Sequence, residues 1–210
     1  MIEAVIWDFG GVLTTSPFEA FARFETEHGL PADIIRRTNA NNHWENAWAK
    51  FERAELDIEA FDRLFAEESL ALGAAVRGKD VLPLLSGDLR PEMVEALRRV
   101  KGQFKTGCIT NNLPANAIGS QSGRSLYVAE VMALFDHIIE SAKIGLRKPD
   151  PRIYQMMTDA LNVDPKHCVY LDDLGVNLKP AREMGMTTIK VLNAEQGIAE
   201  LEAATRLALR

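Results

Sequence analysis

The sequence predicts an α/β protein whose parallel sheet carries a helical insertion after its first strand. Short, largely apolar segments recur along the chain, and helical patterns of similar length lie between them. Unbroken apolar runs are typical of buried parallel strands, and strands that alternate with helices form parallel sheets. The alternation is interrupted after the first apolar run by a long segment with helical patterns and no convincing strand. This segment predicts the insertion.

The core elements follow from these patterns. The expected strands cover residues 2–7, 105–110, 167–171 and 187–192, with a weaker candidate at 135–139. The expected helices cover residues 91–101, 152–161, 178–184 and 194–209, and Pro91 and Pro151 stand near the start of the first two. The Gly- and Ser-rich residues 119–125 predict a loop.

The insertion, called the cap from here on, is expected over residues 15–88, which leaves residues 1–14 and 89–210 for the core. Its helices are predicted at 18–28, 31–39, 42–54, 57–71 and near 79–85. The oligomeric state is open, and an exposed apolar cap helix would support a homodimer.

Composition limits the classes of function. The chain of 210 residues is 47% hydrophobic and has a formal net charge of −6, so we expect a folded protein without a nucleic-acid or membrane partner. Cys108 and Cys168 lack a partner or a metal-ligand spacing and are expected to be buried thiols. No run is long enough to span a membrane and the N-terminus does not resemble a signal peptide, so a cytoplasmic protein is expected.

Polar residues cluster at the carboxyl ends of the predicted strands. Asp8 follows the first strand, Thr110-Asn111-Asn112 ends the second, and Asp172-Asp173 ends the strand near residue 170. Ligands in open α/β sheets bind beyond these ends, so the three groups should face one crevice. Lys148, in the loop before residue 152, is close enough in sequence to a strand end to reach it.

These residue types together indicate phosphoryl-transfer chemistry. Carboxylates that share a crevice repel each other, and a hard cation such as Mg²⁺ removes that repulsion. A carboxylate such as Asp8 can attack phosphorus, while a hydroxyl, amides and an ammonium neutralise the outer oxygens. Each piece alone is compatible with a turn, a helix cap or a solvated loop. The four pieces in order at strand ends favour a site.

At these residues the sequence resembles the haloacid dehalogenase superfamily. The resemblance rests on Asp8-Phe9-Gly10-Gly11, Ile109-Thr110-Asn111-Asn112, Lys148-Pro149 and Leu171-Asp172-Asp173, and it covers nearly the whole chain. Residues 171–182 are especially similar to the branch with the N-terminal phosphatase domain of soluble epoxide hydrolase and a domain of an acyl-CoA dehydrogenase family member. The resemblance implies a Rossmann-like core with a helical cap.

The resemblance also implies roles for site residues. Asp8 would be the nucleophile and a Mg²⁺ ligand, together with Asp173 and the backbone oxygen of Gly10. Thr110 and Asn111 would hold the phosphoryl group, and Lys148 would bridge the charges of nucleophile and phosphate. Asp172 would orient the neighbouring groups, and Asn177 would support the site.

Gly10 departs from the pattern of the superfamily's phosphatases, which carry a second Asp at this position. That Asp protonates the leaving group and activates water, and loss of a general acid/base typically costs about 10²–10⁴-fold. Thr14, Thr15 or a water are the substitutes considered. The leading prediction is therefore a Mg²⁺-dependent phosphomonoesterase for a small organic phosphate, with a rate that the missing Asp would lower. The alternatives are a 2-haloacid dehalogenase-type hydrolase and a catalytically weak module that binds phosphometabolites.

Overall fold

A computed structural model describes residues 1–113 and 122–209. Its core is a five-stranded sheet in which every neighbouring pair is parallel and the order is β3-β2-β1-β4-β5. The strands are β1 (Ala4–Trp7), β2 (Lys105–Thr110), β3 (His137–Glu140), β4 (Cys168–Asp172) and β5 (Thr187–Lys190). All five predicted strands are present, and the α/β parallel fold is confirmed.

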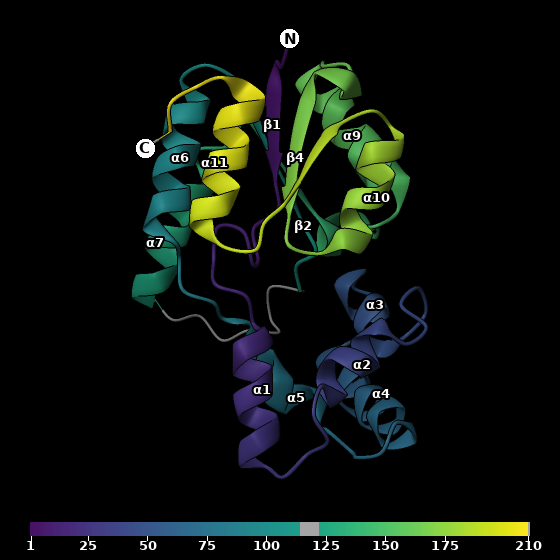
Figure 1. Cartoon of the computed structure of the whole chain (residues 1–210). Coiled ribbons are helices and arrows are strands. Elements are labelled where there is room, and N and C mark those ends of the chain that lie inside the picture. Colours follow the sequence, from purple (N-terminus) through teal and green to yellow (C-terminus); the bar gives the residue numbers. More distant parts are fainter. Residues whose placement is uncertain (114–121, 210) are drawn as a thin grey trace.

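Helices cover both faces of the sheet. The helices of the core are α6 (Pro91–Lys101), α7 (Ser122–Met132), α8 (Ser141–Ile144), α9 (Pro151–Leu161), α10 (Gly175–Glu183) and α11 (Ala194–Thr205), with the short η2 (Pro165–His167). Figure 1 shows α6, α7 and α11 on one face and α9 and α10 on the other. Alternate residues of β1 serve the two faces, since Val5 and Trp7 pack with α6 and α11 while Ala4 and Ile6 pack with α9 and α10.

The structure corrects several predicted boundaries. Helix α7 begins at Ser122, within the loop expected over 119–125; residues 119–121 lie outside the described residues. A weak apolar pattern concealed this helix. Helix α10 begins three residues earlier than expected, and α11 ends at Thr205 because Arg206 adopts a positive φ of 60°. Cys108 and Cys168 are buried free thiols, as predicted.

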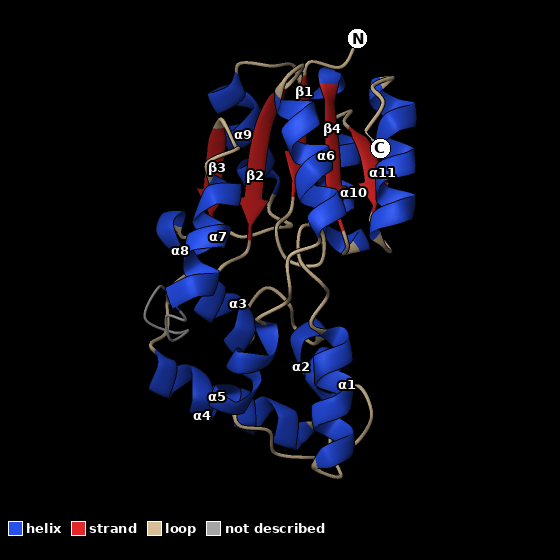
Figure 2. Cartoon of the chain, turned by 90° about the vertical axis from the view of Figure 1, so that its left-hand side faces the viewer, coloured by secondary structure: helices blue, strands red, loops and turns tan. Residues whose placement is uncertain are grey.

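The segment between β1 and α6 is helical. It contains α1 (Phe18–Glu27), α2 (Ile34–Ala40), α3 (Ala47–Glu52), α4 (Ile58–Ala71), α5 (Gly78–Val81) and the 3-10 helix η1 (Leu82–Leu85). These helices share a hydrophobic cluster of their own that includes Phe51, Phe61 and Phe65. Figures 1 and 2 show them as a separate group beyond the carboxyl ends of the strands. The exact cap boundaries stay a prediction.

Two adjacent segments connect the cap to the core. Thr14 and Leu89 form an isolated antiparallel bridge, and Thr15 N–H donates to the carbonyl of Asp88 at 2.8 Å. The cap thereby closes over the strand ends. None of the helices in the described part of the chain combines the length and apolar character needed to cross a membrane.

Candidate active site

The sheet brings the predicted polar residues to one place. Strand β1 lies between β2 and β4, with Trp7 paired to Cys108 on one side and Leu171 on the other. The next residue, Asp8, is therefore level with the ends of both neighbours, and its N–H donates to the carbonyl of Leu171 at 2.8 Å. The chain continues from β1 to β2 and β3 on one side and then crosses to β4 on the other side of β1, so the ends of β1 and β4 lie at the switch point at which α/β sheets bind ligands.

Lys148 joins two of the carboxylates. Its Nζ lies 2.8 Å from Asp8 Oδ1 and 2.8 Å from Asp172 Oδ2, and the residue is only 1% exposed. The Asn111 side chain binds the backbone on both sides: Lys148 N–H donates to Asn111 Oδ1 at 2.8 Å, and Asn111 Nδ2 donates to the Lys148 carbonyl at 3.1 Å. Asn111 thus positions the lysine by way of its backbone.

Asp172 is surrounded by protein donors. Its Oδ2 accepts from Lys148, the Tyr170 hydroxyl and Asn177 Nδ2, while Oδ1 accepts from Leu174 N–H and Asn177 Nδ2. The side chain is fully buried. These hydrogen bonds hold the Asp172 side chain in place, and its contact with Lys148 Nζ in turn fixes the position of the lysine. The supporting roles expected for Asp172 and Asn177 stay predictions.

Asp173 is the more accessible member of the acidic pair. It is half-buried and lines the cavity, whereas Asp172 points into the core. Gly11 makes room for it: a Cβ at Gly11 would lie 2.2 Å from Asp173 Oδ2, and the φ of Gly11 is +73°. Both the backbone conformation and the close approach require glycine here.

The carboxylates are close enough to hold a metal ion. One oxygen from each of Asp8, Asp172 and Asp173 lies within 4.8 Å of the others. Burial raises the pKa of Asp8 well above its ordinary value, with Lys148 opposing and the other two carboxylates reinforcing this shift. Burial and the charge of Asp172 raise the pKa of Asp173 to about 6. A divalent cation would relieve this excess of negative charge.

The donor set fits Mg²⁺. All three candidate ligands are hard carboxylates, and Asp172 already has its donors, which leaves Asp8 and Asp173 for the ion. One or two carboxylates with water and phosphate oxygens are the usual Mg²⁺ environment. The pKa of Lys148 also moves: burial lowers it, but Asp172 and Asp8 more than offset that effect and hold it above its ordinary value.

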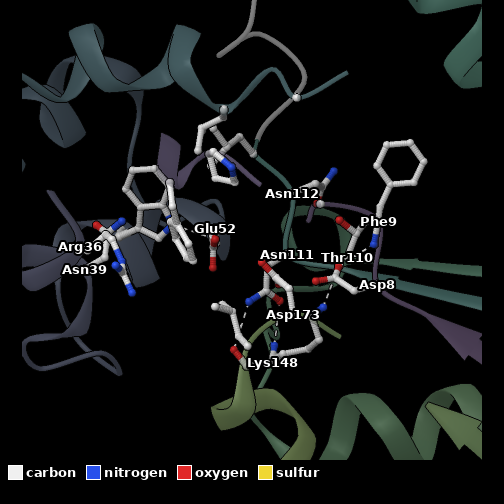
Figure 3. Close-up of a pocket in the computed structure, with 18 of the residues that line it drawn as sticks. Asp8, Phe9, Arg36, Asn39, Glu52, Thr110, Asn111, Asn112, Lys148 and Asp173 are labelled. Atoms are coloured by element: carbon white, nitrogen blue, oxygen red, sulfur yellow. Dashed lines mark hydrogen bonds and ion pairs between the residues drawn. The ribbon is translucent and has the colours of Figure 1, made fainter. Parts of the chain in front are cut away.

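A large cavity lies between the cap and these residues. Its volume is about 1600 Å³, and Asp8, Gly10, Thr110, Asn111 and Asp173 contribute to its wall, together with residues of the cap. Figure 3 shows Asp8, Thr110 and Asp173 on one side, Arg36 and Asn39 on the other, and Glu52 between them. The cavity therefore has a charged end at the sheet and a second wall made by the cap.

Sequence reasoning did not identify several contributors. Tyr170 stands two residues before Asp172 on β4, and this spacing places both side chains on the same face of a strand. The Tyr154 hydroxyl donates to the carbonyl of Asn177 at 2.6 Å, a contact between α9 and α10 that has no local signal. Thr14 and Thr15 use their hydroxyls on backbone groups within the connecting segments.

A family model for haloacid dehalogenase-like hydrolases matches residues 2–185. The chain belongs to this family. The hydrolase is 32% identical to mouse acyl-CoA dehydrogenase family member 10 over 96% of its length, and 30% identical to pig bifunctional epoxide hydrolase 2 over 99%. It spans only 19% and 40% of the lengths of these two relatives. The resemblance predicted from the motifs is confirmed.

Two further similarities concern proteins of comparable length. Phosphatase MT3486 of Mycobacterium tuberculosis (strain CDC 1551 / Oshkosh) is 31% identical over 88% of this chain and 85% of its own. The HAD family enzyme bt-2542 of Bacteroides thetaiotaomicron, solved in complex with magnesium and inorganic phosphate, superposes with a TM-score of 0.63 over 96% of this chain and 99% of its own. At 18% identity, this second likeness supports the fold alone.

Proposed function

We propose that this hydrolase is a Mg²⁺-dependent phosphomonoesterase in which Asp8 is the nucleophile. The observation that carries the proposal is the environment of Asp8, which lies at the switch point with the Lys148 ammonium 2.8 Å from Oδ1 and Asp173 within the same carboxylate cluster. Similarity to a phosphatase over most of both chains supports the same reaction.

The residues would share the chemistry as follows. An oxygen of Asp8 attacks phosphorus, the bond from phosphorus to the ester oxygen breaks, and the departing oxygen takes a proton from solvent water to leave as the alcohol. Water then attacks the aspartyl-phosphate, which releases phosphate and restores Asp8. Lys148 holds a positive charge beside Asp8 throughout, and Thr110 contributes a hydroxyl at the wall of the cavity.

Asp8, Asp173 and the backbone oxygen of Gly10 would hold Mg²⁺. When bound, the ion supplies positive charge to the phosphoryl oxygens. Asn111 acts on this site through the backbone of Lys148, and Asp172 and Asn177 act through the lysine side chain and its partner.

Gly10 leaves the proton-transfer step without a carboxylate at the position where related phosphatases carry Asp. A Cβ at Gly10 would meet nothing within 4 Å, so the backbone leaves open space for a side chain to begin there. The hydroxyls of Thr14 and Thr15 form hydrogen bonds with backbone groups, which argues against either threonine as the replacement for the missing Asp. The proposed phosphatase is therefore slow at the steps that move protons.

The cavity supports an ester larger than the small organic phosphate expected from the sequence. Its volume of about 1600 Å³ exceeds the roughly 300–1,000 Å³ of common ligand pockets. Apolar residues line much of the cap wall, namely Phe18, Phe21, Trp48, Ile58, Leu82 and Leu85. They support an organic group with a sizeable apolar surface.

A phosphate-release screen with and without Mg²⁺ tests the proposal. The panel contains small and bulky phosphomonoesters, and the proteins are the wild type, Asp8→Asn and Gly10→Asp. We expect Mg²⁺-stimulated release by the wild type, none by Asp8→Asn and a gain of at least about 10-fold in Gly10→Asp. Absence of Mg²⁺-stimulated release refutes the proposal.

Chloride release from 2-chloroacids in EDTA would favour the dehalogenase alternative, and tight ester binding without turnover would favour the binding module.

A further inference from the structure

An ion pair joins the cap to the loop that carries Lys148. Arg147 Nε lies 2.6 Å from Oε2 of Glu52, the last residue of α3, and Arg147 Nη1 donates to the carbonyl of His43 at 2.7 Å. The side chains of Arg147 and Glu52 are only 14% and 8% exposed, although 94 residues separate them in the chain. Both line the cavity.

The cap holds its end of this contact firmly. Trp48 Nε1 donates to Glu52 Oε1 at 2.8 Å, so each oxygen of the carboxylate has its own donor. The Trp48 ring packs against Phe61 and Phe65 in the cap's hydrophobic cluster, with ring centroids 5.7 and 6.0 Å apart. A movement of Glu52 therefore requires a movement of the packed cap.

The core holds the other end of the same loop. Arg147 and Lys148 are consecutive, yet Arg147 contacts the cap while Lys148 contacts Asp8 and Asp172. Asn111 binds both backbone groups of Lys148. Two residues of one short loop thus connect the cap with the carboxylate cluster.

We propose that Glu52 and Arg147 are positioning residues that hold the Lys148 loop against the cap, so that Lys148 Nζ stays between Asp8 and Asp172. The proposal rests on the proposed phosphatase function for its kinetic consequence. A displacement of about 1 Å at a reacting group can cost about 10²-fold in rate. Loss of the Glu52 charge should therefore act mainly on kcat, although the partners of Arg147 are Glu52 and the carbonyl of His43 and not the carboxylate cluster.

The cap offers a closely matched control. Arg53 Nε lies 2.6 Å from Glu55 Oε1, and Arg53 Nη1 donates to the carbonyl of Trp44 at 2.8 Å. The Arg53 side chain is 13% exposed, nearly the value of Arg147, whereas Glu55 is 48% exposed against 8% for Glu52, and both partners of this pair belong to the cap. Glu55→Gln therefore removes an ion pair of the same contact distance, with a more exposed carboxylate, without reaching the Lys148 loop.

The kinetic test compares Glu52→Gln with Glu55→Gln at saturating Mg²⁺. We expect kcat to fall about 10- to 100-fold in Glu52→Gln with KM changed less than about threefold, and both constants to stay within about twofold in Glu55→Gln. Arg147→Gln should resemble Glu52→Gln, and the double variant should be no slower than the worse single variant, because the two residues act as one unit. Arg147→Lys keeps the charge and should lose less, which provides a milder variant if the others unfold.

A second readout does not depend on turnover. The Lys148 amide donates to Asn111, so its hydrogen exchange, measured by NMR at one pH, reports how firmly the loop is held. We expect exchange at least about 10-fold faster in Glu52→Gln and unchanged in Glu55→Gln, measured under conditions in which both proteins are fully folded by circular dichroism. If wild-type protein hydrolyses no ester, the proposed function fails while this comparison still decides the positioning role. Unchanged Lys148 exchange, or an unchanged kcat in an active enzyme, overturns the inference.

Discussion

Removal of the Lys148 charge should expose the repulsion that the site contains. In Lys148→Met the side chain keeps its bulk, but the ammonium 2.8 Å from both Asp8 and Asp172 is lost. Breaking a buried ion pair by removing one partner typically costs about 3–5 kcal/mol, because the remaining charge is left uncompensated. At about 2–4 °C per kcal/mol for a chain of this size, we expect Tm to fall by roughly 6–20 °C at pH 8 in EDTA.

The same reasoning predicts two ways to restore the variant. Protonation of the carboxylates at pH 5 should recover part of the lost stability, and Mg²⁺ at pH 8 should do so by supplying the missing positive charge. Urea unfolding of wild type and variant, at both pH values and with or without Mg²⁺, measures each effect.

Lys143→Met is the control for this experiment. Lys143 is nearby in sequence, but its side chain is 72% exposed, so its loss should change stability by no more than about 0.5 kcal/mol. If Lys148→Met is as stable as wild type at pH 8 in EDTA, or if its loss of stability is the same at pH 5, the charge argument is wrong.

Three further predictions follow from the site. The pKa of Asp173 is raised from 3.8 to about 6, so the metal-free protein binds the Asp173 proton more tightly when folded. The resulting stabilisation is complete below about pH 4 and is lost as the pH rises through about 6. The free energy of unfolding should fall by about 3 kcal/mol over this range. Urea unfolding in EDTA should show a smaller slope in Asp173→Asn than in wild type, since Asp8 also has a raised pKa, and Mg²⁺ should flatten the slope of the wild type. Gly11→Ala should weaken Mg²⁺ stimulation of turnover by at least about 10-fold, because the new Cβ would lie 2.2 Å from Asp173 Oδ2. Gly145→Ala is the control: its φ of +68° is similar but no atom lies near the new Cβ, so it should lower stability and leave Mg²⁺ stimulation unchanged. Asn111→Ala should lower kcat by about 10-fold through the Lys148 backbone, and a variant as active as wild type would contradict that role.

Most of the core could be predicted from local patterns. The runs of β1, β2 and β4 are largely buried, which is why each reads as a mainly hydrophobic segment, whereas in the edge strand β5 only Ile189 is buried. Helices α6 and α9 begin at a proline within one residue of the predicted start. Helix α7 escaped prediction because its Gly and Ser residues have low helix propensity and its apolar periodicity is weak.

The candidate site was predictable in its composition and not in its geometry. Asp8, Asn111, Lys148 and Asp172 were expected at strand ends or nearby, and the structure places them in contact. The separate roles of these residues depend on hydrogen bonds that only the folded chain forms, such as those to both carboxylate oxygens of Asp172.

The sequence by itself determined the order of strands and helices, the helical insertion and the set of polar residues available for catalysis, because hydrophobic period and residue type are local properties. Only the tertiary structure decided that Asp172 is fully engaged by donors while Asp173 faces the cavity, and that Glu52 of the cap contacts Arg147 of the core. Contacts between residues distant in the chain depend on how the cap packs over the strand ends, and no local pattern encodes that packing.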